Sequence, residues 1–159
     1  MNSRSEIILV DVTLTTVAAA IADNEVISQS IEIPNVTGLK GSSAMIQSIV
    51  LNSDDTETPA MDLVFSQVNT AIADAASEAV GNSVGDLDAA GASVLGHVSL
   101  SNYTDMVDFV TATKANIGLV VTPAITTTSI FVHAINRSGG NFTPTGTDDL
   151  HLRIGFIRS

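Results

Sequence analysis

The sequence contains no cysteine, no tryptophan and one tyrosine, and it has only six lysines and arginines among 159 residues. Without cysteine the chain has neither a disulfide framework nor a thiolate nucleophile. Seventeen acidic residues stand against the six basic ones, which gives a net charge of −11. Because phosphate backbones and anionic lipids repel so acidic a chain, we expect neither a nucleic-acid nor a membrane partner.

Charged residues of both signs make up only 14% of the chain, whereas hydrophobic residues make up 45%. That hydrophobic share excludes global disorder, and the length suits a single domain over residues 1–159. The low charge density predicts a surface that other subunits partly cover. The apolar run at 17–22 is far too short to span a bilayer, and the N-terminus lacks a signal-peptide pattern. We expect residues 1–7 to form a flexible arm that becomes ordered on docking.

Apolar and polar residues alternate with a period of two along most of the chain, which predicts β-strands. Strands are expected at 8–16, 26–34, 44–52, 60–67, 96–100, 115–123, 126–137 and 150–158, with 103–112 as a loop or weak strand. About eight short strands separated by Gly, Pro and Asn turns predict an all-β fold, an antiparallel β-sandwich that is jelly-roll-like. The alanine-rich stretches 70–80 and 85–95 predict one or two short helical segments, with Asp86 as a helix N-cap.

Two connections between these strands are short enough to predict hairpins. The strand at 60–67 is expected to pair with the one at 44–52, and the strand at 126–137 with the one at 115–123. Within "AMDLVFSQ" the alternation places Met61, Leu63 and Phe65 on the core side and Asp62 on the exposed side.

The residues that carry enzyme or metal chemistry form no recognisable motif. His97, His133 and His151 lack the spacing of a zinc site, and His133 is expected to be a hydrogen-bonded structural histidine. The acidic loop at 52–58 has oxygen ligands of the kind that calcium prefers, but it lacks the glycine and terminal glutamate of an EF-hand, which favours a solvated loop. A hydrolase with two carboxylates distant in sequence stays open. We therefore assign no catalytic, cofactor-binding or metal-binding residue and expect no cofactor and no enzyme activity.

The last predicted strand offers the one candidate contact site. In "LHLRIGFIR" the alternation places Leu150, Leu152, Ile154 and Phe156 inside the sandwich. His151 and Arg153 then point outward, and these two residues are our candidates for an intersubunit contact.

Five segments in their order and spacing carry a resemblance to a known family. They are "AMIQSIVLNSDD", "MDLVFSQ", "DLDAAGASVLGHVSL", "ANIGLVV" and "DDLHLRIGFIR", within residues 44–158. Together they resemble small virion structural proteins of tailed bacteriophages, the capsid decoration or cement proteins. The resemblance implies a β-sandwich or jelly-roll protein without catalytic residues. It also implies a homo-oligomer, often a trimer, whose partner is the major capsid protein.

Two functions follow as expectations. The first is a non-enzymatic virion structural protein on the outer capsid surface, assembled in the host cytoplasm. An outer position agrees with the acidic charge, because packaged DNA would repel this chain. The second is a phage tail or fibre module that recognises a host surface glycan, for which Tyr103 and Phe142 are the available loop aromatics.

Overall fold

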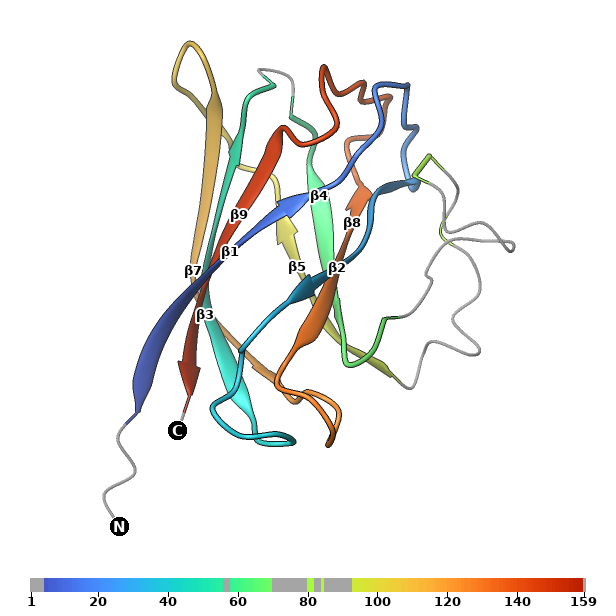
Figure 1. The fold of residues 1–159 in the computed structure, drawn as a ribbon. Helices are drawn as coiled ribbons and strands as arrows, with labels where there is room; N and C mark the ends of the chain where they lie inside the picture. Colours follow the sequence, from blue (N-terminus) through green and yellow to red (C-terminus); the bar gives the residue numbers. More distant parts are fainter. Residues whose placement is uncertain (1–4, 56–57, 70–79, 82–83, 85–92, 159) are drawn as a thin grey trace.

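The computed structural model describes residues 5–55, 58–69, 80, 81, 84 and 93–158 (Figure 1). Nine β-strands lie in this part of the chain: β1 (Glu6–Leu14), β2 (Val26–Ile33), β3 (Ala44–Ser53), β4 (Met61–Ser66), β5 (Val94–Leu100), β6 (Thr104–Asp105), β7 (Val110–Val121), β8 (Ile130–Asn136) and β9 (Leu150–Arg158). The described residues include no helix long and apolar enough to cross a membrane. The predicted helical segments, 70–80 and 85–95, lie almost wholly outside the described residues.

The strands form two antiparallel sheets that pack face to face, as the all-β prediction required. One sheet has the order β1-β9-β3-β7-β6 and the other the order β2-β8-β4-β5. The pairing is nested: β1 pairs with β9, β2 with β8, β3 with β7 and β4 with β5. A long antiparallel ribbon that is rolled up on itself gives this nesting, and it defines a jelly roll. The fold class predicted from the sequence is confirmed.

Both predicted hairpins are wrong. β3 pairs with β7 and β9, whereas β4 lies in the opposite sheet between β8 and β5. β7 and β8 are likewise in different sheets. The reason is physical: alternation specifies which face of a strand is buried, but it does not specify the neighbouring strand. In each case a short connection crosses from one sheet to the other instead of turning back.

The core lies between the two inner faces and follows the predicted alternation closely. Met61, Leu63 and Phe65 of β4 are at most 1% exposed. On β9 the inward side chains are also buried, namely Leu150, Leu152, Ile154 and Phe156. β9 is an interior strand of its sheet, between β1 and β3, so it has a neighbouring strand on each side. Full burial of such side chains is the main stabilising term of the fold.

Several strands differ from the sequence-based expectation in their bounds or in their regularity. β1 begins at Glu6 and pairs Ile7 with Ile157, so the last two residues of the expected arm belong to a strand, while 1–4 lie outside the described residues. β7 already begins at Val110, and β6 precedes it in a tight hairpin. In β2 two register shifts opposite β8 bury both Val26 and Ile27, which breaks the simple alternation.

Candidate interaction surface

The outer face of the β1-β9-β3-β7 sheet carries an apolar row at one end. Ile7 of β1 lies opposite Ile157 of β9, which lies opposite Met45 of β3, which in turn lies opposite Val120 of β7. Four neighbouring strands therefore place apolar side chains side by side on a face that solvent reaches. The next row begins with Leu9, which is 63% exposed.

Two loops extend this apolar character around the end of the sandwich where both termini lie (Figure 1). The β2–β3 loop contributes Leu39 and the β7–β8 loop contributes Ile125. The loops are tied together by a hydrogen bond from the Gly41 amide to the Thr127 carbonyl. We call the five most exposed large apolar side chains of this end the apolar surface; they are 60–84% exposed and comprise Ile7, Leu9, Leu39, Val120 and Ile125.

The apolar surface is also nearly free of charge. Loops 34–43 and 122–129 contain one charged residue, Lys40. Glu6 at the start of β1 is ion-paired with Arg158 at the end of β9, at 2.9 Å between Oε2 and Nη2. In a chain of net charge −11, a second acidic molecule therefore meets little repulsion at these two loops and at the Glu6–Arg158 pair.

The two residues predicted to contact another subunit lie on the same outer face, further along β9. His151 and Arg153 are both exposed, as the alternation predicted. Arg153 is already engaged within the chain, since its Nε and Nη2 donate to the two carboxylate oxygens of Asp11 at 2.6 and 3.1 Å. The hydrogen bond from Arg153 lowers the pKa of Asp11. His151 Nδ1 lies 3.2 Å from the hydroxyl of Thr13. The four side chains surround a shallow polar depression, and nothing in it marks a reactive group.

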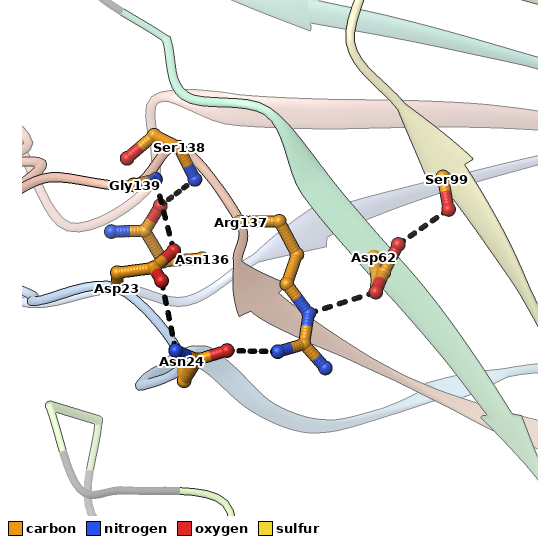
Figure 2. Close-up of polar contacts among 8 residues, drawn as sticks. All are labelled: Asp23, Asn24, Asp62, Ser99, Asn136, Arg137, Ser138 and Gly139. Atoms are coloured by element: carbon orange, nitrogen blue, oxygen red, sulfur yellow. Dashed lines mark hydrogen bonds and ion pairs between the residues drawn. The ribbon is translucent and has the colours of Figure 1, made fainter.

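Asp62 belongs to a polar network on the outer face of the other sheet (Figure 2). Ser99 Oγ donates to its Oδ1 at 2.5 Å, and Arg137 Nε donates to its Oδ2 at 2.9 Å. Burial alone would raise the pKa of Asp62, but the hydrogen bonds from Ser99 and Arg137 outweigh it and the pKa is lowered. Asp62 is thus outward, as predicted, but its side chain is only 18% exposed and holds a salt bridge.

Arg137 continues this network toward the β1–β2 loop. Its Nη1 donates to Asn24, whose side-chain amide donates to Asp23, and Asp23 in turn accepts from the Gly139 amide at 3.0 Å. The network ties the β8–β9 loop to the β1–β2 loop, and each named group has a partner within it. This arrangement is structural cross-linking of two loops.

A hollow of about 320 Å³ lies beside Asp62. Its lining is mostly apolar and includes Asp62, His97 and Arg137. The carboxylate and the guanidinium satisfy each other across 2.9 Å, so neither is left unpaired toward the hollow. No aromatic side chain of the described residues lines it, which argues against a sugar platform.

The two loop aromatics suggested for glycan binding are turned inward. Phe142 is 3% exposed and forms part of the core, and Tyr103 packs against the core from its edge. Burial raises the pKa of the Tyr103 hydroxyl far above its ordinary value. The sequence could not reveal this, because an aromatic in a turn-rich segment can either be exposed or cover a sheet edge.

The remaining titratable candidates are structural. His133 is 1% exposed, its Nε2 lies 3.4 Å from Ser66 Oγ, and burial lowers its pKa to about 4. Asp55 of the acidic loop is also buried and accepts hydrogen bonds from the Thr145 amide and hydroxyl. Among the described residues no group of three or more His, Asp or Glu side chains is placed to hold a metal ion. Residues 56 and 57 of that loop and the predicted N-cap Asp86 lie outside the described part.

Comparison with known proteins adds little to this geometry. No protein-family model matches the chain, and no curated protein matches it. One solved structure that is similar, from Desmodium yellow mottle tymovirus, shares 11% identity over 99% of this chain and 88% of the other, with a TM-score of 0.28. A likeness this weak supports no conclusion about function, and the jelly-roll assignment rests on the strand order alone.

Proposed function

We propose that this chain is a non-enzymatic virion structural protein that decorates the outer surface of a tailed-phage capsid as a homo-oligomer, in the first instance a trimer. The observation that supports this most is the apolar surface. Five large apolar side chains, 60–84% exposed, share one end of a single sandwich. Clustered exposure of this kind marks a surface that a protein partner covers.

Charge favours self-association through this surface. Two copies of net charge −11 repel each other over most of their area. At the apolar surface the Glu6–Arg158 pair is neutral and Lys40 is the loops' one charged side chain, so copies approach there at the smallest electrostatic cost. Arg153 and His151 lie on the adjoining part of the outer face and remain our candidates for the edge of that contact.

An outer position on the shell follows from the same charge, because packaged DNA repels an acidic protein. A decoration protein stabilises a shell because its binding free energy adds to that of the assembled state. An oligomer that touches several capsomers at once converts weak individual contacts into strong attachment. This role needs a rigid scaffold with surfaces that bind other proteins, and it needs no reactive group.

Light scattering coupled to size-exclusion chromatography tests the oligomer. Ile125→Glu should convert the oligomer to monomer, since it places a charge in the apolar surface, while leaving the protomer's melting temperature nearly unchanged. Val17→Glu, at an exposed valine of the β1–β2 loop, is the matched control and should stay oligomeric. Arg153→Ala should keep the protomer folded and weaken the oligomer. A wild-type protein that is monomeric at micromolar concentration would contradict the self-association proposal.

Labelling of virions tests the location. An antibody against this chain should decorate the whole head in negative-stain images. Label confined to the tail would instead support the glycan-binding alternative, and failure to label any part of the virion would refute the virion assignment.

A further inference from the structure

The hairpin that joins β6 to β7 has an unusual residue at its tip. Met106 donates its amide to the Phe109 carbonyl at 2.8 Å, so Val107 and Asp108 form a two-residue turn. Val107 has a φ of 80°, and its amide donates to Asp105 Oδ1 at 2.7 Å. In Figure 1 this hairpin stands at the end of the sandwich opposite the termini.

Valine is poorly suited to that position. Two-residue hairpin turns with a positive φ at the first central residue normally have glycine there. A β-branched side chain in this conformation is strained, and such strain persists where something else compensates for it. Within the described chain nothing covers Val107, which is 82% exposed. Folding of the protomer therefore gains nothing from this side chain.

The neighbours of Val107 are apolar and exposed as well. Met106 is 46% exposed and Phe109 is 40% exposed. Together the three side chains form a small apolar knob, which we define as Met106, Val107 and Phe109. The strain and the exposure of this apolar residue at the tip of a hairpin are both explained if a second molecule buries its side chain. Buried apolar anchors that fill a pocket carry much of the energy in protein interfaces.

We propose that the apolar knob inserts into an apolar socket on a different protein, and that basic side chains rim this socket. The carboxylates of Asp105 and Asp108 flank the knob, so a basic rim complements it. The inference rests on the proposed function in one respect, since it takes the capsid shell as the protein that supplies the socket.

A second copy of this chain does not offer such a rim. Three of its arginines are ion-paired with its own carboxylates, namely Arg137, Arg153 and Arg158. Lys114 donates to the Ser99 carbonyl, and Lys40 lies in the β2–β3 loop at the other end. The described part of the chain therefore holds no cluster of cations that could receive the knob.

Co-sedimentation with shells purified from virions that lack this chain tests the inference. Val107→Gly should weaken binding at least tenfold while the melting temperature stays the same or rises, because glycine relieves the strain and removes the side chain. Asp108→Asn should weaken binding at low salt and reduce its salt dependence. Val17→Gly, at an exposed valine near the same end, is the control and should bind as the wild type does.

The outcomes separate the two proposals. If wild-type protein fails to bind shells, the proposed function and the socket both fail. If wild type binds and Val107→Gly binds equally well, the knob proposal alone is overturned. Binding of the wild type, but not of Val107→Gly, to phosphatidylcholine vesicles would show that the knob enters lipid and would overturn a protein socket.

Discussion

The two ends of the sandwich differ sharply in the chemistry of their loops. At the end with the termini, loops 34–43 and 122–129 hold one lysine and no acidic residue. At the opposite end the connections 15–25, 53–60, 101–109 and 137–149 contain most of the carboxylates of the described chain. Loops 34–43 and 122–129 therefore repel a like molecule less than the acidic connections at the opposite end do. In the oligomer that we propose, this difference favours contact through the end that carries the apolar surface.

The largest expected effect concerns the core that connects the two ends. Phe156 lies on the inner face of β9 with no exposed area, beneath the apolar row. Phe156→Ala should lower the free energy of unfolding by about 3–5 kcal/mol, through lost transfer energy and the cavity left behind. Urea unfolding monitored by circular dichroism measures this. A variant as stable as the wild type would mean that the register of β9 is inverted, and with it the assignment of the apolar row to the outside.

Mild acid should lower the stability of the folded protein through the buried His133. The pKa of His133 is about 4 in the folded state and about 6.5 when unfolded, so the unfolded chain takes up a proton first as the pH falls. Stability should therefore be constant above about pH 6.5 and decline by roughly 3 kcal/mol toward pH 4, at 1.36 kcal/mol per unit of pKa difference.

A pH series of melting curves with a histidine variant tests that assignment. His133→Gln should remove most of the decline between pH 6.5 and 4.5, because the variant has no imidazole that the unfolded chain protonates first. An unchanged decline in the variant would show that the buried histidine does not control stability in mild acid.

The smallest effect distinguishes two neighbouring carboxylates of the acidic end. Asp55 is 5% exposed and binds the Thr145 amide and hydroxyl, whereas the adjacent Asp54 is exposed. Asp55→Ala should cost about 2 kcal/mol, since hydrogen bonds to a charged group contribute about 1.5–3 kcal/mol. Asp54→Ala should change stability by less than about 0.5 kcal/mol. Equal costs for the two variants in thermal melts would indicate that the acidic end is uniformly solvated.

Side-chain alternation alone was sufficient for the inner faces of β4 and β9. It predicted the buried phase of β4 and β9 and the outward position of Asp62, because a pleated strand must place successive side chains on opposite faces. It also predicted that His151 and Arg153 are exposed. The absence of cysteine and the acidic charge are likewise properties of the sequence alone.

Only the tertiary structure decided how the strands pair and what the outer face offers. β3 and β4 are neighbours in sequence but lie in different sheets, because backbone hydrogen bonding is indifferent to side-chain identity and the nested order depends on long-range closure. The apolar row joins Ile7, Met45, Val120 and Ile157, which are up to 150 residues apart (157 minus 7) and meet only through the register of four strands. The strained conformation of Val107 is likewise a property of the closed β6–β7 hairpin, since a valine in sequence predicts an extended strand.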